Sequence, residues 1–333
     1  MAEAKYDVLG IGNAIFDVLV KTDEKFLADH GMTKGGMALI DEARAASIYR
    51  DMGPATEMSG GSAANTIVGI ASFGARAAYV GKVKDDQIGK LYTHDIRAAG
   101  VAFDTRPASD GPATGCSYIL VTDDGERTMN TYLGAAQELT SGDIDAAEIA
   151  AAKIVYLEGY LWDPASAKQA FVKAATIAHS AGREVALTLS DSFCVDRYRD
   201  EFLDLMRKGT VDLVFANEAE LHSLYQTSDF DTALKELRKD AKLGVVTRSA
   251  KGCVVASRDG VVAVPAFAID RLVDTTGAGD LFAAGFLFGL VRNAGYENAG
   301  RLGALAAAEV IQHIGARPLA SLKELAQKNG LPV

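Results

Sequence analysis

An acidic side chain, Asp280, lies in the first turn of a predicted apolar helix, directly after a run of small residues. These small residues are Gly277, Ala278 and Gly279. The first backbone N–H groups of a helix lack partners within it and lie at the positive end of its dipole, so this turn could bind a phosphate or a developing oxyanion. A carboxylate beside such an anion suggests a base that takes a proton from a hydroxyl attacking phosphorus. Asp is also favoured in a first helical turn without a catalytic role, and both interpretations stay open on these residues.

A second glycine pair, Gly60 and Gly61, precedes another predicted apolar helix. Glycine lets a ligand approach the backbone closely. In the first turn of that helix, next to Ser62, the Asn65 amide offers both a donor and an acceptor to a hydroxylated ligand. The same pattern also suits an ordinary tight turn between a strand and a helix. We treat these residues as candidates for substrate binding.

A third polar pair, Asn217 and Glu220, follows a predicted strand. Its spacing matches a helix N-cap and the reciprocal glutamate of a capping box, which requires no ligand. The same amide and carboxylate, on one face at the carboxyl end of a strand, could instead hold water around a Mg²⁺ ion on a nucleotide.

Two common nucleotide-binding motifs are incomplete. The segment that starts at Gly10 has Ile15 in the place of the third glycine of a dinucleotide fingerprint. The segment around Lys82 lacks both the earlier glycine and the following Ser or Thr of a P-loop. A Rossmann dehydrogenase and a P-loop kinase are therefore disfavoured.

The composition excludes several other classes. The 333 residues carry a net charge of −10, which leaves no basic stripe for nucleic acid. The three cysteines, Cys116, Cys194 and Cys253, are far apart and without metal-ligand spacing, as expected of a reduced cytoplasmic protein. We read no signal peptide and no membrane segment, and so expect no membrane partner.

Strand-like runs alternate with amphipathic, alanine-rich stretches along most of the chain. The predicted strands are 6–12, 77–83, 154–159, 184–190, 212–216, 243–247 and 253–257. The predicted helices are 62–73, 86–99, 166–181, 198–208, 218–226, 231–240, 277–292, 297–313 and 320–328. This alternation predicts an α/β fold, a mostly parallel sheet covered by helices on both faces, with ligand sites at the carboxyl ends of its strands.

Two regions interrupt the alternation and predict a small inserted β-sheet lid. Residues 13–44 and 101–132 contain strand-like pieces with turn signals, including the hairpin signature Asp124-Gly125. We assign these two ranges to the lid. The large nucleotide-binding α/β domain then consists of 1–12, 45–100 and 133–333.

From residue 5 to about 318, the chain resembles the ribokinase-like (PfkB) family of carbohydrate and nucleoside kinases. Both family signatures are present, GGSAANTIVGIASFGARAAYVGKVKDDQIG and DTTGAGDLFAAGFL, and NEAE matches the family motif N-x-x-E. The resemblance implies a ribokinase-like fold, with ATP and Mg²⁺ as cofactors. It also implies that Asp280 is the base, that the amides of residues 277–279 form the anion hole, and that Asn217 and Glu220 lie near Mg²⁺.

Within this family, several segments resemble the adenosine kinase branch. The start GIGNAIFDVLV places Asn13 and Asp17 toward a ribose, and TLSDSF places Phe193 against a purine. From the residues alone, Asn13 and Asp17 could be turn and strand-edge residues, and Phe193 could be a core residue. The second purine-side aromatic is not assigned among Tyr160, Leu161 and Trp162.

The nucleotide side departs from the family pattern in one place. In TRSAKG, Ser249 stands where a T-x-G-x-x-G loop has its first glycine. Thr247, Gly252 and Thr276 are nevertheless expected near the ATP phosphates. Arg127, in the lid hairpin, resembles a family arginine that moves onto the phosphates, and it could equally be a solvated hairpin residue.

The resemblance implies transfer of the γ-phosphoryl group of MgATP to the 5′-hydroxyl of a nucleoside, with adenosine, a purine-salvage substrate, preferred. A kinase for ribose, fructose, inosine or guanosine stays open, as does a catalytically silent ligand-binding homologue on the same fold. Activation by K⁺ through carbonyls of the turn before residue 277 and the oligomeric state are also open.

Overall fold

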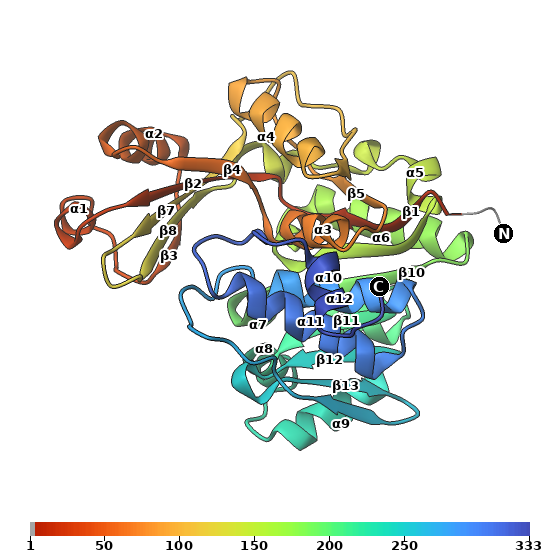
Figure 1. Cartoon of the computed structure of the whole chain (residues 1–333). Coiled ribbons are helices and arrows are strands. Elements are labelled where there is room, and N and C mark those ends of the chain that lie inside the picture. Colours follow the sequence, from red (N-terminus) through yellow and green to blue (C-terminus); the bar gives the residue numbers. More distant parts are fainter. Residues whose placement is uncertain (1–3) are drawn as a thin grey trace.

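The computed structural model describes residues 4–333, in which a large sheet is covered by helices and a smaller sheet projects from one side (Figure 1). Neighbouring strands of the large sheet, in order of pairing, are β14 (Val261–Val264), β13 (Cys253–Ser257), β12 (Leu243–Thr247), β11 (Leu213–Asn217), β10 (Glu184–Thr188), β9 (Ala152–Glu158), β1 (Tyr6–Ile11), β5 (Ala77–Val80) and β6 (Val101–Ala102). The contacts of β13 are antiparallel and the other pairings are parallel. The predicted α/β fold is therefore confirmed.

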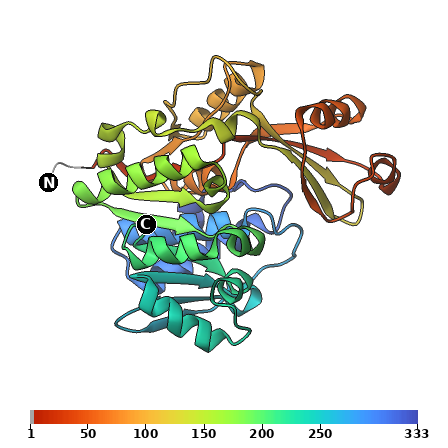
Figure 2. The same ribbon diagram turned by 180° about the vertical axis from the view of Figure 1, so that it is seen from behind.

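Two groups of helices cover the two faces of the large sheet. On one face lie α3 (Ser62–Ser72), α4 (Gln87–Ala98), α10 (Ala278–Val291), α11 (Tyr296–Val310) and α12 (Leu322–Lys328). On the other lie α5 (Ala146–Ala150), α6 (Ala165–Ser180), α7 (Ser192–Arg207), α8 (Glu218–Tyr225) and α9 (Phe230–Asp240), seen from behind in Figure 2. Alternate residues of the central strands enter the two cores, which is why these strands are apolar throughout.

The position of α10 is fixed by close packing against α11. A Cβ atom at Gly285 would lie 2.3 Å from the Leu302 carbonyl oxygen, and one at Gly289 would lie 2.6 Å from the Ala299 Cα. Glycine at both positions therefore lets the two helix backbones approach. Because α10 also contacts α3, its amino-terminal residues are held beside the start of α3.

The small sheet has the strand order β3 (Met37–Leu39), β8 (Arg127–Tyr132), β7 (Gly115–Val121), β2 (Ile15–Lys21) and β4 (Thr56–Gly60). Helices α1 (Glu24–Asp29) and α2 (Glu42–Asp51) pack on one of its faces. The predicted hairpin joins β7 to β8, with Gly125 at a φ of 84°.

Two strands lie in a different sheet from the one that our domain boundaries imply. Strand β4 falls within 45–100, assigned to the large domain, but it pairs with β2 in the small sheet. Its sequence, TEMSG, is polar and begins with exposed residues, so it carries no strand signal. Strand β6 falls within 101–132, assigned to the lid, but its two residues pair with β5 in the large sheet.

None of the helices between residues 4 and 333 combines the length and the hydropathy that crossing a bilayer requires.

Candidate active site

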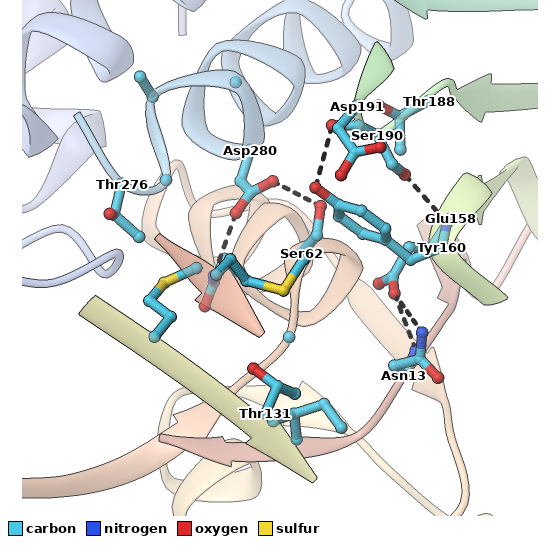
Figure 3. Close-up of a pocket in the computed structure, with 18 of the residues that line it drawn as sticks. Asn13, Ser62, Thr131, Glu158, Tyr160, Thr188, Ser190, Asp191, Thr276 and Asp280 are labelled. Atoms are coloured by element: carbon cyan, nitrogen blue, oxygen red, sulfur yellow. Dashed lines mark hydrogen bonds between the residues drawn. The ribbon is translucent and has the colours of Figure 1, made fainter. Parts of the chain in front are cut away.

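A cavity of about 890 Å³ lies between the inner face of the small sheet and the carboxyl ends of the large-sheet strands (Figure 3). The residues proposed from the sequence that line it are Asn13, Asp17, Gly61, Ser62, Asn65, Phe193, Asn217, Glu220, Thr247, Thr276, Gly277, Ala278, Gly279 and Asp280. Gly60, Arg127 and Gly252 do not line it. The fold thus brings most of the expected residues around one space.

The Asp280 carboxylate is held by two donors from the start of α3. Its Oδ1 accepts a hydrogen bond of 2.6 Å from Ser62 Oγ, and its Oδ2 accepts one of 3.1 Å from Asn65 Nδ2 (Figure 3 shows Asp280 beside Ser62). Burial raises the pKa of Asp280 to about 6, against the lowering effects of these two bonds and of Arg317. A carboxyl with a pKa near neutrality is suited to proton transfer.

The turn before α10 has two glycines that are required for different reasons. Gly277 has a φ of 77°, and a Cβ atom there would lie 2.8 Å from the Ala316 Cα, so the backbone alone requires glycine. A Cβ atom at Gly279 would meet no protein atom within 4 Å. The open space that the anion-site interpretation needs is therefore beside Gly279. The Ala278 N–H donates to the Thr275 carbonyl at 3.2 Å.

Asp17 is the second carboxylate that faces the cavity. A Cβ atom at Gly60 would lie 2.2 Å from Asp17 Oδ2, so Gly60 makes room for this carboxylate although it does not line the cavity itself. Burial raises the pKa of Asp17 to about 7, against the opposing charges of Arg317 and Arg127. Among residues 4–333, no donor forms a hydrogen bond with the Asp17 carboxylate, which leaves its oxygens free for a ligand.

Glu158, at the end of β9, is a site residue that the sequence analysis missed. Its Oε1 accepts hydrogen bonds from the backbone N and the Nδ2 of Asn13, at 3.2 and 2.9 Å, and its Oε2 accepts one of 2.8 Å from the Ala63 N–H (Figure 3). Burial raises the pKa of Glu158 to about 7. The signal was an acidic residue directly after the apolar run 154–157 of this strand.

Arg317 is the second missed residue. Its Nε donates to Asn65 Oδ1 at 2.8 Å, and its Nη2 donates to the Ser59 carbonyl at 2.6 Å. It follows the last helical turn of α11 by several residues, in a segment without regular structure. No sequence pattern in this segment indicates a contact with the start of α3.

The side of the cavity proposed for a base contains two aromatic side chains. Tyr160 lines the cavity and donates its hydroxyl to the Ser190 carbonyl at 3.2 Å, whereas Leu161 and Trp162 are buried in the core. Tyr160 is therefore the member of this trio that faces the cavity. Phe193 is 64% exposed, so its interpretation as a core residue is wrong.

Asn217 and Glu220 form the capping box that their spacing predicts. Asn217 Oδ1 accepts from the Glu220 N–H at 2.9 Å, and Glu220 Oε2 accepts from the Asn217 N–H at 3.0 Å. Burial raises the pKa of Glu220 to about 7. The same two side chains line the cavity, together with Thr247. Gly252 has a φ of 86°, and a Cβ atom there would lie 2.0 Å from the Val264 carbonyl oxygen, so its place in the turn between β12 and β13 is explained by the backbone.

Arg127 is not the solvated hairpin residue that we considered. Its side chain is 9% exposed, and Nη1 donates to both carboxylate oxygens of Asp274, at 2.7 and 2.6 Å. The Asp274 carboxylate also accepts from the N–H groups of Thr276 and Gly315. In this structure Arg127 therefore contacts the turn before α10 and not the cavity.

Comparisons with known proteins agree with this geometry. The profile of the family described as "pfkB family carbohydrate kinase" matches residues 52–322. The crystal structure titled "probable sugar kinase protein" from Rhizobium etli CFN 42 is 53% identical, with a TM-score of 0.93 over 99% of this chain and 100% of that chain. The adenosine kinase of Sinorhizobium meliloti is 56% identical, with a TM-score of 0.92 over 98% and 100% of the two chains.

A curated relative extends the similarity to a third kind of acceptor. The ATP-dependent ribose-1-phosphate kinase of Halopiger xanaduensis is 30% identical over 288 residues, which cover 84% of this chain and 83% of the relative. The three relatives thus carry names that differ in substrate but agree in being kinases.

Proposed function

This chain belongs to the pfkB family of carbohydrate kinases, and from that premise we propose that it phosphorylates the 5′-hydroxyl of a nucleoside, preferably adenosine. Enzymes of this family are phosphotransferases that act on hydroxyl groups, with ATP as the donor. The observation that carries the nucleoside proposal is that Asp17, whose carboxylate accepts no hydrogen bond from residues 4–333, and two aromatic side chains, Tyr160 and Phe193, share one cavity with Asp280.

These groups match the two parts of a nucleoside. Asp17 accepts hydrogen bonds from the two ribose hydroxyls, since its oxygens have no partner in residues 4–333 and a carboxylate is a strong acceptor. Asn13, whose Nδ2 is already directed to Glu158, lies beside the ribose and orients it. Phe193 and Tyr160 provide flat apolar surface for the purine.

The reaction requires Asp280 to meet the 5′-hydroxyl. Asp280 takes the proton of this hydroxyl late in a loose transition state, while the hydroxyl oxygen attacks the γ-phosphorus of ATP. The amides at residues 277–279, at the positive end of α10, stabilise charge on the transferring group, for which the Ala278 N–H has to exchange its bond to the Thr275 carbonyl for one to the phosphoryl group. The space beside Gly279 admits the phosphoryl oxygens to these donors.

We place ATP on the large domain, with Thr247 and Thr276 on its phosphate side, and Gly252, which does not line the cavity, in the turn that follows Thr247. Mg²⁺ bound to the phosphates would supply positive charge to the transferring group. A side-chain oxygen of Asn217 and one of Glu220 each already accept a hydrogen bond from the other residue's backbone N–H. These residues are therefore better suited to bind Mg²⁺ through bridging water molecules than to ligate it directly. Activation by K⁺ at the carbonyls of the turn before Gly277 is part of the same proposal, and rates in K⁺ and tetramethylammonium buffers test it.

A sugar acceptor is the second candidate function. The similarity to the probable sugar kinase of Rhizobium etli CFN 42 is as extensive as that to the adenosine kinase, and it supports this alternative. Asp17 could bind the hydroxyls of ribose or fructose equally well. A sugar, however, leaves the aromatic side of the cavity unfilled. A ligand-binding protein without activity is disfavoured, because Asp280 keeps both of its positioning donors.

A phosphorylation panel with MgATP tests the proposal. Adenosine, inosine, guanosine, ribose and fructose are compared by kcat/KM, and ³¹P NMR identifies the phosphorylated hydroxyl. We expect adenosine to have the highest kcat/KM and its product to be the 5′-phosphate. A higher kcat/KM for ribose or fructose than for adenosine would replace the nucleoside proposal with the sugar alternative.

A further inference from the structure

Arg317 connects Asp280 to strand β4 through a chain of hydrogen bonds. Its Nε donates to Asn65 Oδ1 at 2.8 Å, and Asn65 Nδ2 in turn donates to Asp280 Oδ2 at 3.1 Å. At its other end, Nη2 donates to the carbonyl and the Oγ of Ser59, at 2.6 and 3.1 Å. Arg317 does not line the cavity, so it can influence a reaction there only through its neighbours.

The guanidinium of Arg317 determines which way the Asn65 amide faces. Arginine has donors only, so the Asn65 atom directed to it must be the oxygen. The NH₂ group of the amide then faces Asp280 and donates to its carboxylate. If the amide were turned over, its oxygen would face Asp280 and would favour the protonated form, which cannot accept a proton.

The position of the guanidinium is itself fixed by a pair formed by the buried Ser59 hydroxyl and a half-buried carboxylate. Asp95, on α4, accepts from the N–H and the Oγ of Ser59 at 2.8 and 2.6 Å. Because the Ser59 hydroxyl hydrogen is used by Asp95, its oxygen is left as an acceptor for Arg317. Donation therefore runs outward from Arg317 in two directions, through Ser59 to Asp95 and through Asn65 to Asp280.

We propose that Arg317 is a positioning residue for phosphoryl transfer, which locks the Asn65 amide so that Asp280 stays an ionised carboxylate able to act as the base. This inference rests on the proposed role of Asp280. The positive charge of Arg317 acts in the same direction as the locked amide, because an opposite charge favours the ionised form of a carboxyl.

The other titratable groups around Asp280 are acidic or neutral. Burial is the main cause that raises the pKa of four of them, and the charge of Asp280 adds to it: Asp17 on β2, Glu158 and Tyr156 on β9, and Tyr160 directly after β9. Burial raises the pKa of Asp280 itself, and Arg317 is the charged group that lowers it. Arg317 thus offsets a concentration of buried acids next to the base.

The pH dependence of kcat with adenosine and MgATP at saturation tests the proposal, because kcat reports the groups that titrate in the substrate complex. The acid limb is the pH range in which kcat falls as the pH decreases. In Arg317→Met, we expect the midpoint of this limb to move upward by about one pH unit or more. At pH values below the limb kcat should then be about tenfold lower than in the wild type, and at pH values above the limb it should be near that of the wild type. Arg317→Lys keeps the charge, so its limb should lie closer to that of the wild type. Arg292→Met, which removes an exposed arginine at the other end of α10, serves as the matched control and should leave the limb in place.

A uniform loss of rate at every pH in Arg317→Met, with the limb unmoved, would mean that Arg317 only supports the fold and would overturn the proposal. If Arg317→Met does not fold, the same upward shift is expected in Arg317→Gln, whose amide can present either its oxygen or its NH₂ group to Asn65 and so neither locks that amide nor carries the charge. An unmoved limb in that variant would overturn the proposal equally.

A double-mutant cycle with Asn65→Ala tests the route through Asn65. If Arg317 acts through this amide, Arg317→Met should add little to the loss of kcat in Asn65→Ala, and fully additive losses would exclude that route. Asp280→Asn separates this inference from the proposed function. Retained turnover in Asp280→Asn would reject the base itself, whereas lost turnover combined with an unmoved limb in Arg317→Met would reject the inference alone.

Discussion

The Arg127 guanidinium joins the small sheet to the turn that precedes α10, through two hydrogen bonds from Nη1 to the Asp274 carboxylate. Both side chains are buried, at 9% and 3% exposure. Asp274 also accepts from two backbone N–H groups of the large domain, so it stays fixed when the pair separates. A movement of Arg127 onto the phosphates therefore has to break this ion pair.

Arg127→Ala is expected to lower kcat and to leave adenosine affinity nearly unchanged, because the proposed contact with the transferring phosphoryl group is strongest in the transition state. Steady-state kinetics and calorimetry measure the two effects. Asp274→Asn is the control, since it weakens the ion pair but keeps the guanidinium. Equal kcat values in Arg127→Ala and Asp274→Asn would mean that Arg127 contributes only through the ion pair. A wild-type kcat in Arg127→Ala would mean that Arg127 has no role in the reaction.

Adenosine is expected to protect the hairpin of β7 and β8 from hydrogen exchange, because closure of the small sheet over the acceptor would shield backbone groups from solvent. ATP alone, bound on the large domain, should protect the hairpin much less. Exchange mass spectrometry on the apo protein and the two complexes compares them. Exchange in residues 114–132 that is indifferent to adenosine would contradict a moving lid.

Asp17→Ala should weaken adenosine binding by about 1.5–3 kcal/mol for each charged hydrogen bond lost, with a smaller effect on kcat. In the wild type, 2′,3′-dideoxyadenosine should bind more weakly than adenosine for the same reason. Calorimetry provides both affinities. If the two nucleosides bind the wild-type protein equally well, Asp17 does not recognise the ribose hydroxyls.

The acid limb of the kcat profile should fall near the Asp280 pKa of about 6. Below that pH the carboxyl is protonated and cannot accept a proton, so kcat decreases as the pH falls. Measurements in constant-ionic-strength buffers, with both substrates saturating, locate the limb. A kcat that is constant from well above to well below this pKa would contradict proton transfer to Asp280.

Local patterns in the sequence are sufficient to predict the large sheet and most of the cavity. The central strands are apolar on both faces because helices cover both, and the glycine turns before α3 and α10 are short-range signals. The capping box of Asn217 and Glu220 was likewise predictable, because its hydrogen bonds join residues three positions apart.

The residues that were missed depend on contacts between distant parts of the chain. Glu158 contacts Asn13 across 145 positions, and Arg317 contacts Asn65 across 252 positions. Strand β4 was missed for a related reason, since its polar residues are held in a sheet by pairing with β2 and not by their own propensity. Only the folded structure shows which distant residues meet.

The most direct test of the account is the turnover of Asp280→Asn with adenosine and MgATP, measured together with its adenosine affinity. The substitution keeps the size of the side chain but removes the base. We predict that kcat falls by about 10²- to 10⁴-fold while the calorimetric affinity for adenosine stays close to that of the wild type. A kcat close to that of the wild type would contradict the role of Asp280 in phosphoryl transfer.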